Sequence, residues 1–389
     1  MSEMSFDSAV QPPSDDDARA HRYHRTGRIL SVAGYLLDLG ILLILLFTGG
    51  SAALRTLAIS ATPRPWLSLC VYLLLFGAIT QVAGLPLDYL RGFWLEHRYG
   101  LSKLTLGGWL LDQLKGLAVS AVLGLLAVEF LYTVIRRWPG HWWVICACVF
   151  LLLFILMANL APVLILPIFY KFRPLENSSL TERLLELSRR AGTSVKGVFE
   201  WKLGEKSKKA NAALLGLGNT RRIILSDTLL AGFSDDEIEA VLAHEFGHHV
   251  HRHILQLIAI QGAGLFLGFY LIERTLAWLG PHFGFQSGAD FANLPLLALV
   301  TTFLSLLLLP VVNSYSRALE RQADAYALHS LASPAPFISG MEKLAGLNLA
   351  ERRPHPWIEF IFHSHPSIAK RVAFAHRFAA GPSQPGLGH

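Results

Sequence analysis

Charged residues are scarce in this chain of 389 residues. Asp, Glu, Lys and Arg together make up 16% of it, whereas hydrophobic residues make up 52%. Ordinary soluble domains carry about 25% charged residues. The mean hydropathy is +0.42. This composition excludes an ordinary soluble protein and predicts a mostly α-helical integral membrane protein, in contact with the lipid bilayer.

Cysteine is nearly absent, and basic residues do not gather in a stripe. The three cysteines, Cys70, Cys146 and Cys148, all lie in apolar segments, which excludes a disulfide framework and a cysteine metal site. The net charge is +6, without aromatic residues interleaved among the basic ones. This pattern excludes nucleic-acid binding and fits a positive cytoplasmic face over anionic lipid.

Apolar segments long enough to cross a bilayer occur six times. They are Ile29–Phe47, Trp66–Tyr89, Leu106–Val134, Trp142–Phe169, Ile254–Leu279 and Phe291–Val312. Because the third and fourth are long for single crossings, the expected architecture is a bundle of six or seven transmembrane helices. A small α+β domain accompanies the bundle, and its type follows from the motif in residues 244–248.

The segments divide the chain into six parts, and the polar first residues do not predict a cleavable signal peptide. The expected parts are a flexible tail (1–28), N-terminal membrane helices (29–170), a soluble part (171–253), a transmembrane hairpin (254–312), a C-terminal helical part (313–380) and a flexible tail (381–389). The distribution of Lys and Arg favours a cytoplasmic amino terminus. The soluble part, with any active site it carries, is therefore expected to face the cytoplasm. The membrane is expected to be the cell membrane in a bacterium or the endoplasmic reticulum in a eukaryote.

The stretch His244-Glu245-Phe246-Gly247-His248 matches the H-E-x-x-H pattern of zinc hydrolases. Ser234 and Glu237 predict a capping box, so a helix is expected from about Asp235 through His248. His244 and His248 then lie one turn apart on one face, where both imidazoles reach one zinc ion. Glu245 lies beside them, as a general base requires. Accidental spacing on a solvated helix is the alternative interpretation.

A third ligand must come from further along the chain, since the residues after His248 do not continue the metzincin pattern. Glu320 stands out among the downstream carboxylates, because Asp324 follows it by one helical turn. Asp324 is expected to accept the second N–H of a ligand histidine. Glu320 follows the sixth apolar segment and the histidines precede the fifth, so an antiparallel hairpin brings them to one membrane face. The alternative for Glu320 and Asp324 is a surface ion-pair ladder.

A small sheet is expected beside the H-E-x-x-H helix. Residues 211–217 and 221–226 flank Gly218-Asn219-Thr220 as a short hairpin. An exposed edge strand can bind an extended peptide through backbone hydrogen bonds. The alternative is a hairpin that only closes the domain.

With these residues in place, the chain resembles the CAAX prenyl protease 1 family of membrane zinc metallopeptidases over nearly its whole length. The shared stretches are Glu96–Gly100, Pro167–Phe172, Asn211-Ala212, His244–His248, Asn313–Asp324 and His365-Pro366 with Arg371. Two departures are Ala213, where relatives often carry an aromatic residue, and six apolar segments against the family's seven spans.

The resemblance implies one zinc ion per chain, held by His244, His248 and Glu320, with Glu245 as base and Asp324 as orienting carboxylate. It implies that His365 lies near the scissile carbonyl and that Asn211, Ala212 and Arg371 bind substrate. It also implies an intramembrane chamber that the site faces. The implied substrates are peptides or proteins with prenylated or similar C-termini.

Two other functions fit parts of this pattern. One is a quality-control protease of the HtpX kind, which cuts damaged membrane proteins with the same chemistry. The other is a non-catalytic zinc-binding scaffold or transporter, although a structural zinc normally has four protein ligands and needs no Glu245. The oligomeric state is not predicted.

Overall fold

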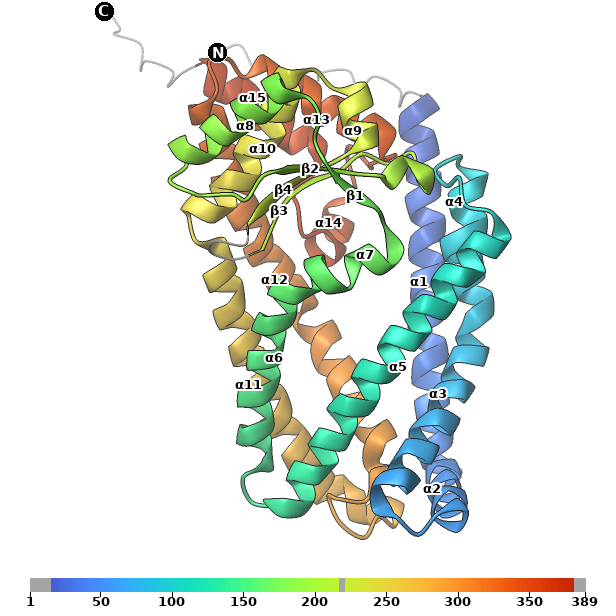
Figure 1. The fold of residues 1–389 in the computed structure, drawn as a ribbon. Helices are drawn as coiled ribbons and strands as arrows, with labels where there is room; N and C mark the ends of the chain where they lie inside the picture. Colours follow the sequence, from blue (N-terminus) through green and yellow to red (C-terminus); the bar gives the residue numbers. More distant parts are fainter. Residues whose placement is uncertain (1–14, 217–220, 381–389) are drawn as a thin grey trace, which may run out of the picture.

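Six long helices dominate the computed structural model, which describes residues 15–216 and 221–380 (Figure 1). These helices are α1 (Asp15–Phe47), α3 (Pro65–Tyr89), α5 (Leu106–Arg137), α6 (Trp142–Leu164), α11 (His253–Leu279) and α12 (Leu294–Ser330). By length and composition, six helical segments within the described ranges are able to cross a membrane, as predicted. Apolar segments of this length satisfy their backbone hydrogen bonds internally, which a bilayer requires.

The six long helices form a closed ring. Helix α1 packs on α3 and α12, α5 packs on α3 and α6, and α11 packs on α6 and α12 (Figure 1). Each of the six helices therefore contacts its two neighbours in the ring, while α12 also packs on α10 and α3 on α2. One end of the ring meets the part of the chain that contains the sheet.

Polar contacts close the end of the ring that lies away from the sheet. Helix α2 (Gly50–Ala61) packs there against α3 and the 3₁₀ turn Phe291–Asn293. The Ser51 hydroxyl is 2.7 Å from the Tyr72 hydroxyl and donates to the Ala292 carbonyl at 2.7 Å. Arg55 forms an ion pair with Asp290. Buried hydrogen bonds of this kind hold three separate segments together.

The amino-terminal region corrects the prediction of a flexible tail over residues 1–28. Residues 15–28 are helical and belong to α1, whereas residues 1–14 and the predicted tail 381–389 lie outside the described residues. Arg28 donates to Glu351 at 2.7 Å, and His24 Nε2 is 2.8 Å from the Leu349 carbonyl. These contacts with the C-terminal part give residues 15–28 a fixed place that their polar sequence did not indicate.

A four-stranded sheet lies at the other end of the ring (Figure 1). Its strands are β1 (Phe172–Pro174), β2 (Val198–Trp201), β3 (Ala212–Leu215) and β4 (Arg222–Ser226), in the order β1-β2-β4-β3. Strands β3 and β4 are antiparallel, with Ala212 opposite Leu225, as the predicted hairpin requires. Residues 217–220, which include the predicted turn, lie outside the described residues. Strand β3 is an edge strand.

Helices cover one face of this sheet and form a core with it. They are α8 (Ser178–Arg190), α9 (Asp227–Gly232), α10 (Asp235–Val250), α13 (Ala335–Leu347) and α15 (Ile368–Ala380). Ile223 and Leu225 alternate along β4 and are fully buried, together with Leu242 and Phe246 of α10. Residues Ile223 to Ser226 of β4 are all buried, and the strand faces the apolar side of α10 through Ile223 and Leu225.

Short helical segments connect the larger elements. They are a π-helix (Leu90–Trp94), α4 (Leu95–Arg98), α7 (Leu166–Phe169), α14 (Pro356–Phe362), and 3₁₀ turns at Leu203–Glu205 and Gly280–Phe283. Helix α11 begins at His253, directly after α10, and α12 returns beside α11 and packs on α10. The predicted hairpin is therefore present, and it brings the end of α12 back to α10.

Candidate metal centre

The first part of the site is α10, whose start is fixed by the predicted capping box. The Ser234 hydroxyl accepts from the Glu237 N–H at 3.3 Å, and the Glu237 carboxylate accepts from the Ser234 N–H at 2.8 Å. The helix runs over Asp235–Val250, two residues beyond the predicted end. His244 is buried and His248 is half-buried on the same side of the helix, with Nε2 atoms 3.2 Å apart.

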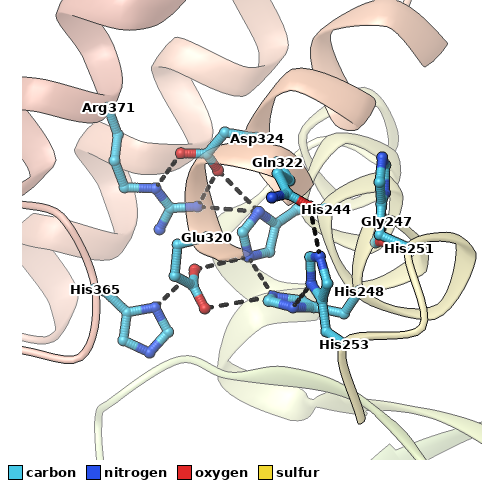
Figure 2. A network of polar contacts seen from close by, with 10 residues as sticks. All are labelled: His244, Gly247, His248, His251, His253, Glu320, Gln322, Asp324, His365 and Arg371. Atoms are coloured by element: carbon cyan, nitrogen blue, oxygen red, sulfur yellow. Dashed lines mark hydrogen bonds and ion pairs between the residues drawn. The ribbon is translucent and has the colours of Figure 1, made fainter. Parts of the chain in front are cut away.

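The second part is α12, which carries Glu320 to the two histidines (Figure 2). Glu320 Oε2 is 3.2 Å from His244 Nε2, and Glu320 Oε1 is 3.4 Å from His248 Nε2. One ligand atom from each of the three residues lies within 4.8 Å of the others. The structure therefore brings together the three side chains that the sequence proposed, although about seventy residues separate them along the chain.

The spacing of these three side chains fits one metal ion. Ligands held about 2.1 Å from one tetrahedral ion lie about 3.4 Å from one another, and the observed separations are 3.2 to 3.4 Å. Glu320 Oε2 is buried, and the polar atoms beside it in the described residues are the imidazole nitrogens His244 Nε2 at 3.2 Å and His365 Nδ1 at 2.8 Å. Two imidazole nitrogens and a carboxylate of this kind repel one another unless a cation or a proton lies between them.

Asp324 and Arg371 lie on the other side of His244. Asp324 Oδ1 is 2.8 Å from His244 Nδ1, and Arg371 donates to both carboxylate oxygens of Asp324 at 2.6 and 2.9 Å. Burial and Arg371 lower the pKa of His244, but Asp324 and Glu320 outweigh them and raise it to about 9. The Nδ1–H of His244 donates to Asp324, and the raised pKa means that Nε2 also carries a proton until a cation displaces it. The Nε2 lone pair would then face Glu320.

This arrangement corrects the substrate-binding role predicted for Arg371. Its side chain is 9% exposed and is held by Asp324, with Nη2 3.2 Å from His244 Nδ1. Burial lowers the pKa of Arg371, but the charge of Asp324 outweighs it and raises that pKa above its ordinary value. Arg371 therefore neutralises and orients Asp324 from behind the site instead of facing a substrate.

His253 and Gln322 were not identified from the sequence. His253 Nδ1 is 2.9 Å from His248 Nδ1, and His253 Nε2 is 3.2 Å from Gln322 Oε1 (Figure 2). Gln322 Oε1 only accepts, so His253 carries its proton on Nε2. His253 Nδ1 then accepts from His248, whose Nε2 lone pair is left free.

The turn between α10 and α11 explains why His253 was missed. Arg252 has a φ of 56°, in the left-handed region, and this residue ends one helix and starts the next. The break turns His253 back toward His248, which a continuous helix does not do at a spacing of five residues. His251 instead hydrogen bonds the Gly247 carbonyl through Nδ1 at 3.0 Å. Only the spacing of His253 from His248 was visible in the sequence.

Two residues on the open side of the site were predicted to take part in the reaction. Glu245 is half-buried and forms no hydrogen bond or ion pair with any residue of the described ranges, so its carboxylate is free to act on a water molecule. His365 lies in the loop between α14 and α15, and its Nδ1 is 2.8 Å from Glu320 Oε2. Its side chain is 60% exposed. An imidazole in this position can contact both the centre and a bound molecule.

The predicted substrate-binding residues Asn211 and Ala212 lie at the start of edge strand β3, which packs beside α10. Asn211 is exposed, and its carbonyl accepts from the Ser226 N–H of β4 at 2.9 Å. Hydrogen bonding alternates along an antiparallel pair. The backbone groups of Ala212 and Leu214 therefore point to the free edge, where an extended peptide can pair with them.

Comparisons with known proteins match the whole of this architecture. The family model "Peptidase family M48" matches residues 174–379, and the model "CAAX prenyl protease N-terminal, five membrane helices" matches residues 11–171.

CAAX prenyl protease 1 of Saccharomyces cerevisiae is 32% identical, over 78% of this chain and 71% of its own length. The uncharacterized metalloprotease YhfN of Bacillus subtilis is 29% identical, over 94% of this chain and 86% of its own. The crystal structure of S. mikatae Ste24p aligns with a TM-score of 0.84 at 25% identity, over 94% of this chain and 91% of that one.

Proposed function

This chain belongs to peptidase family M48 and is a membrane metalloprotease of the CAAX prenyl protease type, and we propose that one zinc ion, held by His244, His248 and Glu320, serves its reaction. The family, the fold class and the enzyme class agree with the predictions from the sequence. The family implies a metal; its identity, its number and the roles of individual residues are our proposals. The non-catalytic scaffold is set aside, since the chain is a metalloprotease.

The observation that carries this proposal is the convergence of two imidazole nitrogens and one carboxylate oxygen on a single point. His244 Nε2, His248 Nε2 and a Glu320 oxygen face one point, and neutral imidazole with carboxylate suits zinc better than Mg²⁺ or Ca²⁺. Three protein ligands leave a position open for water or substrate. A zinc ion bound there would polarise the scissile carbonyl and lower the pKa of a water molecule.

Glu245 acts as the general acid–base group in this proposal. Its carboxylate takes the proton of the attacking water and then delivers it to the nitrogen of the departing amine, so the peptide bond breaks without release of an unstable amide anion. The absence of a hydrogen bond or ion pair to Glu245 within the described part of the chain supports this assignment. A structural carboxylate in a partly buried position would normally have such a partner.

The residues behind the ligands keep them in the protonation state that metal binding needs. Asp324 accepts from His244 at 2.8 Å, and His253 accepts from His248 at 2.9 Å, so both histidines present Nε2 toward Glu320. Arg371 balances the charge of Asp324. We assign these three side chains positioning roles, which typically affect metal affinity rather than the chemical step itself.

His365 stabilises the transition state in this proposal. Its Nδ1 lies 2.8 Å from Glu320, so the ring is held at the rim of the centre, and its exposed side can donate to the oxyanion of the tetrahedral intermediate. The substrate backbone pairs with Ala212 and Leu214 on the free edge of β3, and Asn211 contacts it next to the scissile bond.

The proposed substrate class is based on the relatives of this chain. Several are CAAX prenyl protease 1 or homologues of it, and we propose that this chain removes C-terminal residues from prenylated or similar peptides. A pocket of about 440 Å³ between the end of α6 and the sheet supports an apolar substrate group, because Val163, Phe172 and Phe199 are among its lining residues. We further propose that the site faces the cytoplasm, from a cell membrane or the endoplasmic reticulum.

The domain division is also a proposal. The boundaries of the two matched regions support a membrane part before residue 171 and a peptidase part after it. The transmembrane hairpin 254–312 then belongs to the peptidase part, since it connects α10 to the end of α12.

Cleavage mapping tests the substrate proposal. The purified chain is incubated with a farnesylated C-terminal peptide, the same peptide without the prenyl group, and an unfolded membrane protein. We expect zinc-dependent cleavage of the farnesylated peptide near its prenylated cysteine, with a higher kcat/KM than for the unmodified peptide. Preferential cleavage of the unfolded membrane protein would instead favour the quality-control alternative.

A further inference from the structure

Ala210, two residues before edge strand β3, has both of its backbone polar groups bound by one side chain. Its N–H donates to Asn348 Oδ1 at 2.9 Å, and its carbonyl accepts from Asn348 Nδ2 at 3.1 Å. Asn348 directly follows α13 and is 138 residues away along the chain. Its amide offers both an acceptor and a donor, so it binds Ala210 in the way that a residue of a neighbouring strand does.

The two groups of Ala210 point to the same edge of the sheet as the groups proposed to bind substrate. The Asn211 carbonyl accepts from the Ser226 N–H of β4 at 2.9 Å, and the Asn211 N–H donates to the Ser226 hydroxyl at 2.9 Å. Because hydrogen bonding alternates along an antiparallel strand, Ala210 faces the other edge, as Ala212 does. The Asn348 amide therefore lies where a peptide strand paired with Ala212 would continue.

The backbone around Asn348 is fixed on both sides. The Asn348 N–H donates to the Leu344 carbonyl of α13 at 3.0 Å. Leu349 has a φ of 47°, in the left-handed region that few residues other than glycine adopt, and its side chain is 6% exposed. Its carbonyl accepts from His24 Nε2 of α1 at 2.8 Å. Asn348 cannot move away from the edge without breaking these contacts with α13 and α1.

We propose that Asn348 is a specificity-determining residue, which ends the substrate-binding edge and limits how many residues can follow the scissile bond. This inference rests on the proposed function, in which a peptide pairs with the free edge of β3. The peptide runs antiparallel to β3, as β4 does on the other side, since antiparallel pairs are more common and slightly more stable. Its C-terminal end then points toward Ala210 and Asn348.

The distance between Ala212 and Ala210 limits the length of the peptide that is released. A strand advances about 3.4 Å per residue, so Asn348 lies about 7 Å beyond the position opposite Ala212. Asn211, which is proposed to contact the substrate next to the scissile bond, lies between these two points. Roughly two or three residues therefore fit between the scissile bond and Asn348. A longer C-terminal segment must leave the edge before it reaches Asn348.

The alternative role of Asn348 is only to satisfy buried backbone groups. Ala210 is 3% exposed, and buried N–H and carbonyl groups require partners. In that case, loss of Asn348 lowers the stability of the protein and affects every peptide alike. The proposed role predicts an effect that depends on the number of residues after the scissile bond, so the length of the peptide separates the two roles.

A series of farnesylated peptides tests the proposal on the full chain. The peptides share one sequence up to the farnesylated cysteine and carry three or eight residues after it. In the wild type, we expect kcat/KM to be roughly five- to thirtyfold lower for the longer peptide, because its path past Asn348 disrupts one or two backbone hydrogen bonds to β3. Asn348→Ala frees the backbone groups of Ala210 for the peptide, so the difference should shrink to about twofold or less.

Binding without turnover separates this proposal from the proposed reaction. The same peptides, labelled with a fluorophore, are titrated into the Glu245→Gln protein, with and without Asn348→Ala, and Kd is measured by fluorescence anisotropy. We expect the same dependence on length in Kd. If the wild type cleaves neither peptide, the proposed reaction fails, whereas the length dependence of Kd still tests Asn348.

The matched control is Asn177→Ala. Asn177 caps α8 by accepting from the Leu180 N–H at 3.1 Å, so its loss should lower the Tm and leave the preference for the shorter peptide unchanged. Asn348→Asp keeps the size of the side chain and should keep the preference as well. If Asn348→Ala does not fold, Asn348→Ser replaces it, because its shorter side chain also leaves room. Equal values for the two peptides in the wild type, or an unchanged preference after shortening of Asn348, would overturn the proposal.

Discussion

Gly247 of α10 and Ala323 of α12 are in direct backbone contact. A Cβ atom on Gly247 would lie 2.8 Å from Ala323 Cα and 3.0 Å from the Ala323 carbonyl oxygen. The glycine between the two histidines therefore lets α12 approach closely enough for Glu320 to reach them. Close helix packing and ligand geometry thus depend on the same residue.

Substitution of Gly247 by alanine is expected to separate α10 from α12. The new methyl group meets backbone atoms that cannot rotate away, so we expect a loss of about 1–3 kcal/mol in stability and a weaker metal affinity. The measurements are thermal unfolding and zinc titration. Gly264→Ala in α11 is the control, since no atom lies within 4 Å of its added Cβ and alanine favours helix. Equal stability and affinity in both variants would contradict this account of the contact.

Substitution of Glu245 by glutamine is expected to leave the metal bound and to remove the base. The amide keeps the size of the carboxylate but cannot accept the proton of the attacking water, so kcat should fall on the order of 10²–10⁴-fold. Zinc content by elemental analysis and peptide turnover are measured on the same sample. Wild-type turnover with full zinc content would exclude Glu245 as the base.

Metal removal is expected to abolish peptidase activity reversibly. A chelator should inactivate the enzyme, and stoichiometric zinc should restore it. If a typical zinc binding energy of about 12 kcal/mol is shared by four ligands, Glu320→Ala should weaken zinc binding by roughly a hundredfold or more. Activity that persists after the zinc content has fallen to zero would refute the proposed centre.

Replacement of His253 is expected to disturb the metal site without touching the reacting atoms. His253→Ala removes the acceptor that fixes the tautomer of His248, so zinc affinity should fall by roughly 10–100-fold. At saturating zinc, kcat should recover much of its wild-type value, which separates positioning from catalysis. His249→Ala is the matched control, because within the described residues the His249 side chain has no hydrogen bond, ion pair or ring contact. A positioning role is excluded if both variants bind zinc equally well.

Local patterns in the sequence were sufficient for the elements of the site. The capping box at Ser234, the one-turn spacing of His244 and His248, and the run into the fifth apolar segment each depend on residues close together in the chain. In a helix, the spacing of two residues along the chain determines whether their side chains lie on the same face. For the same reason, Asp324 was identified as the partner of a ligand histidine from its position one turn after Glu320.

Contacts between distant segments were beyond the reach of these patterns. Residues 15–28 look like a polar tail, and only the contacts of His24 and Arg28 with residues 349 and 351 make them part of α1. Arg371 was predicted to bind substrate, and only the packing of α15 against α12 places it on Asp324. The role of such polar residues depends on a contact with a residue that is distant in the chain, and local sequence patterns do not identify that residue.

The sequence by itself determined the chemistry of this protein: membrane helices, a pair of histidines, a base, and an acid side chain returned to them by a hairpin. The tertiary structure alone decided how that chemistry is held, through the Gly247–Ala323 contact, the His253 turn at Arg252, and the burial of Arg371. The physical reason is the distance along the chain over which each effect acts. Hydrophobicity and helical spacing act along the chain, whereas tautomers, charge balance and ligand separations are set by side chains that meet only when the chain has folded.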